Sequence, residues 1–308
     1  MILPFWIQIT FLVFSPTVKV ALCYPRDLRL ELLPSLENRP KYTKYWKSGE
    51  ASEQFFHVRP DGAACFPDSR NPGGWIYVSN FEAKVNGTGG VGAITFDAQG
   101  QVVNYEMVLD KTTMNCGGGK TPWNTWVSCE EWGRDGDSHG NIYQVDPTGK
   151  RPPEKLTLGR EGGKWESFAY DIRDLQTPYF FVTVDVKDGA LQRFQPDQIN
   201  WENPWDMLHG AGATVYLVLN PDSTGDTGTF AWSKDKSEAQ ANAKANYPNT
   251  EGIDVHDGIL FFVCKGIKMI FELDLDNFRY KRKSTTSGQY EYRVVVQYST
   301  SGTLLAKP

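Results

Sequence analysis

The segment from Asn115 to Trp132 gathers side chains that can bind metal ions. It places the Cys116 thiol and the Glu130 and Glu131 carboxylates around a three-glycine turn and a rigid Thr-Pro-Trp corner. Thiolates and carboxylates are metal ligands, and buried carboxylates are costly unless they are paired or bound to a metal. The segment therefore predicts a metal site more readily than a hydrophobic core.

Other chemistries fit this segment less well. Gly117–Thr121 resembles the end of a phosphate-binding P-loop, but the first glycine of that pattern is missing and Pro122 stands where the helix should begin. Adjacent strand residues point to opposite faces, so Glu130 and Glu131 do not form the paired carboxylates of a glycosidase. For Cys116, a buried or disulfide-bonded cysteine is the alternative to a metal ligand.

The composition indicates short strands joined by many turns. The 308 residues include 29 glycines and 18 prolines, and 13% are aromatic. With 32 basic and 37 acidic residues, the net charge of −5 excludes a basic surface for nucleic acid. We expect Ser237–Asn246, the segment most favourable to a helix, to be a solvated loop because it is polar on all sides.

The first 23 residues are typical of a secretory signal peptide. Ile2–Phe14 is an almost continuous apolar run that is too short to span a bilayer, and Val20–Cys23 offers small residues for cleavage. A buried first strand is the alternative. We therefore expect a secreted, extracellular protein without membrane contact after signal removal, in which residues 24–308 form one domain. The sequon Asn86-Gly87-Thr88 predicts glycosylation at Asn86.

Five segments share a strand–turn–strand pattern, with first strands that begin at Trp75, Trp126, Tyr179, Ala213 and Ile259. Their spacing of roughly 35 to 50 residues is close to the period of a propeller blade. We therefore predict an all-β fold, a β-propeller, with a sandwich of hairpins as the alternative.

Several of these first strands end in polar residues. Asn80 and Glu82 share one face of a strand, as do Cys129 and Glu131, while Glu130 points away. The innermost strands of a propeller line its channel, so such residues from different blades can converge on one metal site.

Residues 115–131 read Asn-Cys-x-Gly-Gly-x-Thr-Pro-Trp-x-Thr-Trp-x-x-Cys-Glu-Glu. This motif resembles the signature of the PhoX-type alkaline phosphatases, secreted bacterial enzymes with algal and other relatives. Shorter resemblances extend over about residues 70 to 290 and comprise Ser79–Glu82, Leu158–Glu166, Val184–Leu191, Thr214–Leu217 and Glu251–Ile253.

The resemblance implies a propeller of five to six blades in the complete fold, and we expect the chain to stop at Pro308 before the last blade. It implies a channel that holds iron and several calcium ions, and an enzyme that hydrolyses small-molecule phosphate monoesters there. We expect this protein to be a monomer. By motif position Cys116 would be the iron ligand, and Glu166 and Glu251 would be metal carboxylates. These three residues would be catalytic, while Glu82 and Glu131 would contribute on the calcium side.

Two positions depart from the family pattern. Trp165 stands where the family has histidine, and Asn249 stands where it has arginine two residues before Glu251. The missing arginine removes a bidentate phosphate clamp, and Lys120 and Arg160 are the candidates to replace it in substrate binding. The alternative function is a non-catalytic or diverged calcium-binding β-propeller.

Overall fold

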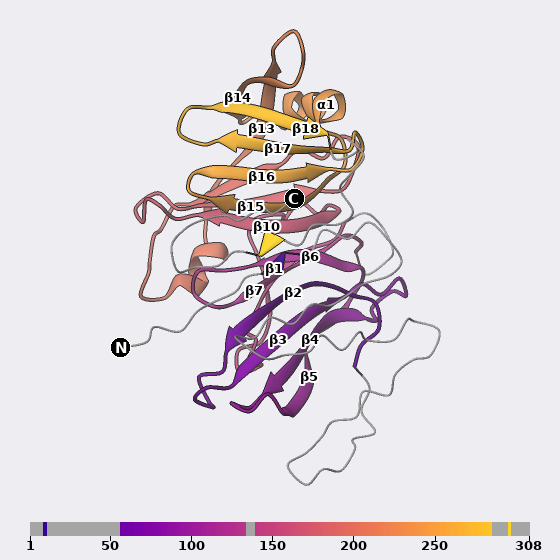
Figure 1. Ribbon diagram of the computed structural model, residues 1–308, viewed down its shortest axis with the longest axis vertical. Helices are drawn as coiled ribbons and strands as arrows, with labels where there is room; N and C mark the ends of the chain where they lie inside the picture. Colours follow the sequence, from indigo (N-terminus) through magenta and orange to yellow (C-terminus); the bar gives the residue numbers. More distant parts are fainter. Residues whose placement is uncertain (1–8, 11–55, 134–138, 285–294, 297–308) are drawn as a thin grey trace.

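The chain repeats a four-stranded antiparallel unit along its length (Figure 1). The computed structural model describes residues 9–10, 56–133, 139–284 and 295–296. Most of the predicted signal peptide lies outside the described residues, apart from strand β1 (Ile9–Thr10), which pairs with β19 (Val295–Val296).

Four such units, here called blades 1 to 4, follow one another in chain order. Blade 1 comprises β2 (Pro60–Pro67), β3 (Trp75–Phe81), β4 (Gly89–Phe96) and β5 (Val102–Thr112). Blade 2 comprises β6 (Asn115–Lys120), β7 (Trp126–Glu130), β8 (Ile142–Val145) and β9 (Glu154–Lys155). Blade 3 comprises β10 (Trp165–Asp171), β11 (Tyr179–Val184), β12 (Gln192–Pro196) and β13 (Gly212–Pro221). Blade 4 comprises β15 (Thr250–His256), β16 (Ile259–Cys264), β17 (Met269–Asp274) and β18 (Arg279–Ser284).

The first strand of each blade is the innermost one. Strands β2, β6, β10 and β15 contact one another in that order, and Figure 1 shows β6 and β10 between blade 1 at one end and blade 4 at the other. Strand β14 (Thr227–Ser233) joins β13 to β18, so blades 3 and 4 share one nine-stranded sheet. The predicted all-β propeller is confirmed.

The predicted repeat was wrong in two respects. The strands that begin at Trp75, Trp126, Tyr179 and Ile259 are the second strands of their blades and not the innermost ones. The segment that begins near Ala213 forms β13 and β14, which are outer strands and not a blade of their own. Second strands bury both faces between neighbouring blades, so their apolar runs are the strongest signal in the sequence.

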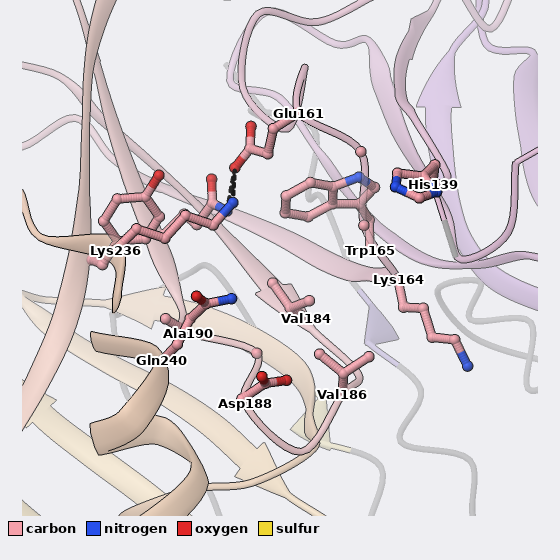
Figure 2. A pocket seen from close by; sticks show the side chains of 15 residues that line it. His139, Glu161, Lys164, Trp165, Val184, Val186, Asp188, Ala190, Lys236 and Gln240 are labelled. Carbon is pink, nitrogen blue, oxygen red and sulfur yellow. Dashed lines mark hydrogen bonds and ion pairs between the residues drawn. The ribbon is translucent and has the colours of Figure 1, made fainter. Parts of the chain in front are cut away.

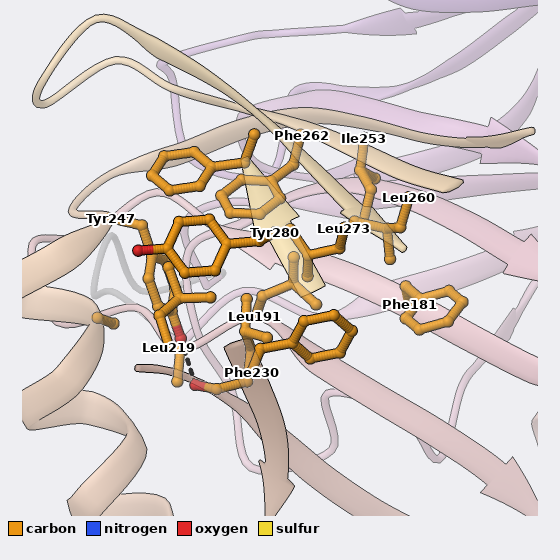
Figure 3. Packing of buried hydrophobic residues seen from close by; sticks show 14 of the residues in the cluster. Phe181, Leu191, Leu219, Phe230, Tyr247, Ile253, Leu260, Phe262, Leu273 and Tyr280 are labelled. Atoms are coloured by element: carbon orange, nitrogen blue, oxygen red, sulfur yellow. Dashed lines mark hydrogen bonds between the residues drawn. The ribbon is translucent and has the colours of Figure 1, made fainter. Parts of the chain in front are cut away.

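Apolar clusters fill the spaces between consecutive blades. Val78 of blade 1 meets Trp126 of blade 2 in one cluster, and Val127 of blade 2 meets Phe180 of blade 3 in the next. The largest cluster lies between blades 3 and 4, where Phe181 and Leu191 share a core with residues such as Phe262 (Figure 3). Burial of such side chains contributes roughly 1.5 to 3 kcal/mol each, which fixes the blades against one another.

The expectation of a loop at Ser237–Asn246 was wrong. This segment lies in helix α1 (Lys236–Asn246), whose first turn is capped by the Asp235 side chain accepting from Ser237 N and Glu238 N. Two alanines, Ala239 and Ala243, are fully buried in the largest cluster. Small apolar residues leave little periodic signal, so the buried face escaped detection in the sequence. A short 3₁₀ helix, η1 (Pro204–Leu208), precedes β13.

Candidate metal centre

Each innermost strand begins with a break in its register against the second strand. The breaks fall between residues 60 and 63, 115 and 118, 165 and 168, and 250 and 253. The second residue of each strand lies inside its break, and these four residues are Asp61, Cys116, Glu166 and Glu251. We call them the inner ring. A bulge re-aims the side chain that it contains, so the four blades place four potential ligands at equivalent positions.

A second set of equivalent positions follows the second strand of each blade. It consists of Glu82, Glu131, Asp185 and Lys265, which we call the outer ring. The backbone N–H of each donates to the carbonyl of the residue before the innermost strand. The four bonds are Glu82 to Arg59 at 3.2 Å, Glu131 to Met114 at 3.0 Å, Asp185 to Lys164 at 2.8 Å and Lys265 to Asn249 at 3.0 Å. This shared bond establishes that the four positions correspond.

The two rings meet in a compact acidic cluster. Oxygens of Glu131, Glu166 and Asp185 lie within 4.8 Å of one another. The Cys116 thiol donates to Glu166 Oε1 at 3.2 Å. On the side of blade 4, Lys265 Nζ lies 2.5 Å from Asp185 Oδ2 and 2.5 Å from Glu251 Oε1. The described residues thus bring Cys116, Glu131, Glu166 and Glu251 together, and their roles as ligands stay a prediction.

Burial disfavours the charged forms of this cluster. It raises the pKa of Glu131 to about 7, and the charges of Asp185 and Glu82 add to that rise. It also raises the pKa of Asp61 to about 6, with Glu82 adding to it. For Glu166 the pKa lies well above its usual range because of burial and then because of the neighbouring Glu251. Desolvation and like charges act in the same direction here, and a bound cation would reverse both.

The same causes act on the thiol and on the last inner-ring carboxyl. Burial, followed by the charge of Glu166, raises the pKa of Cys116 well above its usual value. Burial also raises the pKa of Glu251, while the ammonium group of Lys265 opposes that rise.

The residues present suit both a hard and a softer metal ion. Glu166 is 6% exposed, and its Oε2 has no hydrogen-bond partner among the described residues. A buried carboxylate oxygen without a partner costs free energy that a coordinated cation would recover. Several carboxylates suit calcium, and a single thiol among oxygen donors suits a transition metal such as iron.

Polar side chains of neighbouring blades hold the inner ring in place. The bulge in β6 leaves carbonyls outside the ladder, and Asn80 Nδ2 donates to the carbonyls of Cys116 and Gly117, both at 2.6 Å. Likewise Thr183 Oγ1 donates to the carbonyl of Glu251 at 2.6 Å. Asn80 is therefore a support for the site and not a ligand, because its Oδ1 accepts from Trp126 Nε1 at 2.9 Å.

Close approach of the innermost strands requires glycine after two of the ring residues. A Cβ atom on Gly62 would lie 2.9 Å from the carbonyl carbon of Gly117. A Cβ atom on Gly117 would lie 2.3 Å from the carbonyl oxygen of Glu166. The glycine-rich segment Asn115–Lys120, predicted to be a turn, is consequently strand β6. Its glycines allow three blades to approach at the channel.

The remaining predicted residues lie around the cluster or away from it. Glu82 belongs to the outer ring and pairs with Arg59 at 2.7 Å. Lys120 lies four residues along β6 from Cys116, roughly 13 Å by the rise of a strand, and its Nζ donates to the carbonyl of Cys65 at 3.1 Å. Arg160 is exposed and donates to Thr157 Oγ1 at 3.2 Å. The structure brings neither of these two cations into the rings.

Three other predictions concern Glu130, Asn86 and the cysteines. Glu130 points away from the cluster, where its carboxylate accepts from Thr113 N at 2.8 Å and from Asn141 N at 2.9 Å. Asn86 is exposed in a turn, and its glycosylation stays a prediction. The four described cysteines are free, so Cys116 is not disulfide-bonded to another of them; they are Cys65, Cys116, Cys129 and Cys264.

Three residues of the site escaped detection in the sequence. Asp61 belongs to the inner ring, Lys265 to the outer ring, and Arg59 precedes β2. For Asp61 a signal was present, because Asp61-Gly62 repeats the ligand–glycine pair of Cys116-Gly117 and Glu251-Gly252. For the two cations no local pattern distinguishes them from solvated charges.

Comparison with solved structures supports the propeller fold. PhoX from Pseudomonas fluorescens, in complex with the transition state analogue vanadate, matches with a TM-score of 0.54 and 16% sequence identity over 75% of this chain. The match spans 63% of the length of that PhoX chain, so the likeness concerns the fold and only part of the larger protein.

Two further solved structures match with lower scores. They are the PQQ-bound aldose sugar dehydrogenase from Streptomyces coelicolor (TM-score 0.40, 13% identity, 77% of this chain and 68% of that chain) and a mutant apocarotenoid oxygenase from Synechocystis (TM-score 0.35, 9% identity, 81% and 66%). No protein-family model and no curated protein matches the chain. Among the described helices, none has the length and apolar composition needed to cross a bilayer.

Proposed function

We propose that this protein is a secreted, metal-dependent phosphomonoesterase that binds calcium and iron at the two rings and acts on small-molecule phosphate esters. The observation that carries the proposal is the convergence of six carboxyl groups and one thiol from four blades, with the buried Glu166 Oε2 lacking a partner. A fold without a cation would gain nothing from such a concentration of like charges. The likeness to PhoX with bound vanadate adds support for phosphate chemistry.

The chain offers distinct ligands for the two kinds of metal. Cys116 and Glu166, which are 3.2 Å apart, would hold iron. Glu131 and Asp185, together with Glu166, would hold calcium. When bound, these ions would polarise the phosphoryl oxygens and neutralise charge that develops on them.

Arg59 is the candidate to replace the phosphate clamp that is missing at Asn249. The two residues occupy equivalent positions, because the carbonyl of Arg59 accepts from Glu82 N as the carbonyl of Asn249 accepts from Lys265 N. The Arg59 side chain is 40% exposed and borders the cluster through its pair with Glu82. A guanidinium group there can bind a phosphate through two parallel N–H donors.

A non-catalytic calcium-binding propeller is the second candidate function. Two observations favour it: Lys265 engages two carboxylates of the cluster, and Asn249 Nδ2 donates to Asp185 Oδ1 at 3.0 Å where the family has arginine. Lys265 neutralises acidic charge in the cluster, and the uncharged Asn249 amide occupies the position at which an arginine would offer a guanidinium group to phosphate.

The two functions are separated by metal analysis and hydrolysis of p-nitrophenyl phosphate on the same purified protein. We expect calcium-dependent hydrolysis and at least a roughly 100-fold loss of kcat/KM, together with lost metal, in Glu166→Gln, because a metal ligand is removed. The matched control Glu106→Gln, on outer strand β5, should keep both properties. Bound calcium without hydrolysis would favour the second function, and a protein that takes up no metal would contradict both.

A further inference from the structure

A second concave site lies beside blade 3 (Figure 2). It is a cavity of about 380 Å³ between the segment before β10, the end of β11, strand β12 and helix α1. This size is within the range of small-molecule sites. None of the ring residues lines it, so the metal centre does not explain its presence.

Gln192 lines this cavity and carries an unsatisfied hydrogen-bond acceptor. The residue is 3% exposed and lines the cavity, and its Nε2 donates to Glu161 Oε1 at 2.9 Å. Its Oε1 has no partner among the described residues. An unpaired buried polar atom costs free energy, and a ligand that donates a hydrogen bond would remove that cost.

The charges that line the cavity balance one another. The lining includes Lys164, Lys236, Glu161 and Asp188. Lys236 Nζ lies 3.4 Å from Glu161 Oε1 (Figure 2). A cavity with equal numbers of cations and anions has no preference for a strongly charged ligand. It does offer donors and acceptors at short range, which a molecule with several hydroxyl groups can satisfy together.

An apolar wall completes the cavity. Trp165, Val184, Val186 and Ala190 line it alongside the polar groups. The combination of an apolar wall with a few convergent polar groups is typical of sites that fix the orientation of a small molecule. Sugars and cyclitols match this arrangement because they carry C–H surfaces as well as hydroxyl groups.

We propose that this cavity binds an uncharged, hydroxyl-rich small molecule of the monosaccharide or cyclitol class. One hydroxyl of the ligand donates to Gln192 Oε1, and others bond to Glu161 and Lys236. Two lining residues are sequence neighbours of ring residues, because Trp165 precedes Glu166 and Val184 precedes Asp185. An extension, which rests on the proposed phosphatase function, is that the cavity receives the alcohol part of a sugar phosphate.

The proposal is tested by measuring the binding of D-glucose and of myo-inositol in ligand-detected NMR titrations. EGTA is present, so that neither metal nor hydrolysis is involved. We expect at least one probe to bind, and Gln192→Leu to weaken its affinity by about tenfold or more because the acceptor is lost. The control Gln195→Leu, on the same strand but outside the cavity lining, should bind as the unmodified protein does. Absence of binding by both probes, or equal binding by Gln192→Leu, would overturn the proposal.

Thermal unfolding of Gln192→Leu shows whether a loss of binding comes from unfolding of the variant. Gln192→Leu removes the unsatisfied Oε1 and also the Nε2 bond to Glu161 Oε1. These two effects on stability oppose each other, so the unfolding temperature of the ligand-free variant should change little. A strongly destabilised variant would show that Gln192 has a structural role and would contradict the assignment. For the extension, Gln192→Leu should raise KM for glucose 6-phosphate and leave KM for p-nitrophenyl phosphate unchanged. Failure of that last comparison alone would leave the binding result intact.

Discussion

Blade 4 differs from the other three blades at one position of the outer ring. Blades 1 to 3 place Glu82, Glu131 and Asp185 after their second strands, whereas blade 4 places Lys265 there. The backbone is the same in all four, because each of these residues donates the same N–H bond across the blade. The scaffold therefore accepts either charge, and the side chains alone determine what the site binds.

The lysine supplies the cluster with a cation from the chain itself, as Arg59 does for Glu82. Its ammonium group lies 2.5 Å from both Asp185 and Glu251, in contrast to the unpaired Glu166 Oε2 on blade 3. The chain's own cations thus neutralise Glu82, Asp185 and Glu251. The proposed metal ions would be needed most at Glu131 and Glu166. Three substitutions test this contrast.

The largest effect is expected for Lys265→Glu, which makes the outer ring acidic in all four blades. In the metal-free protein the free energy of unfolding should fall by about 2 kcal/mol, less than for a fully buried ion pair because the Lys265 side chain is 40% exposed. Calcium should restore stability, with one additional ion bound per chain. Urea denaturation in EGTA and calorimetric titration with calcium measure the two quantities.

The exposed Lys187→Glu provides the control, since surface changes of this kind usually stay within about 0.5 kcal/mol. If Lys265→Glu bound the same number of calcium ions as the unmodified protein, the lysine would not stand in for a metal.

A smaller effect is expected for Thr183→Val, which removes the support between blades 3 and 4. The variant leaves the carbonyl of Glu251 without its donor at 2.6 Å and Ser167 N without its acceptor at 3.0 Å. We expect a loss of about 1.5 kcal/mol, typical of a broken buried hydrogen bond, by urea denaturation. Thr214→Val on β13 is the control and should show no loss. Equal stability of both variants would mean that the bulge in β15 needs no side-chain support.

The smallest effect is expected for Asn249→Arg, which gives blade 4 the residue that blade 1 has at Arg59. Asn249 has φ 57°, a region that asparagine tolerates better than arginine, and its side chain bonds Asp185. We expect a cost of about 1 kcal/mol in thermal unfolding. Arg59 itself has φ 51°, so the fold can accept arginine there. An unchanged unfolding temperature would show that neither the backbone conformation nor the bond to Asp185 stabilises the protein.

The sequence predicted the architecture because a propeller repeats its second strands. These strands are buried on both sides, as Ile76, Val127 and Phe181 show with no exposed surface. The innermost strands were harder to recognise. Asn115–Lys120 contains three glycines, which lower strand propensity, and only the close contact with Glu166 on the next blade explains why they belong in a strand.

Site residues that lie in a long sequence motif could be predicted. Site residues that only the three-dimensional arrangement of the blades brings together could not. Cys116 and Glu131 lie within one motif, and the structure brings both to the rings. Lys265 follows an ordinary apolar strand, so in the sequence it is indistinguishable from a solvated lysine. Its importance depends on the equivalence of four blades, which appears only when their hydrogen bonds are compared.

Strand β14 affects where this protein can aggregate in solution. It pairs with β13 from Tyr216 to Pro221 and with β18 from Arg279 to Lys281. Without it, blades 3 and 4 would each present an unpaired outer strand, and such strands are templates on which other chains aggregate. With it, both edges are closed by the chain's own hydrogen bonds. Resistance to aggregation should therefore be greatest in this half of the molecule. Association between copies would begin at the outer strands β5 and β9, which end their sheets among the described residues.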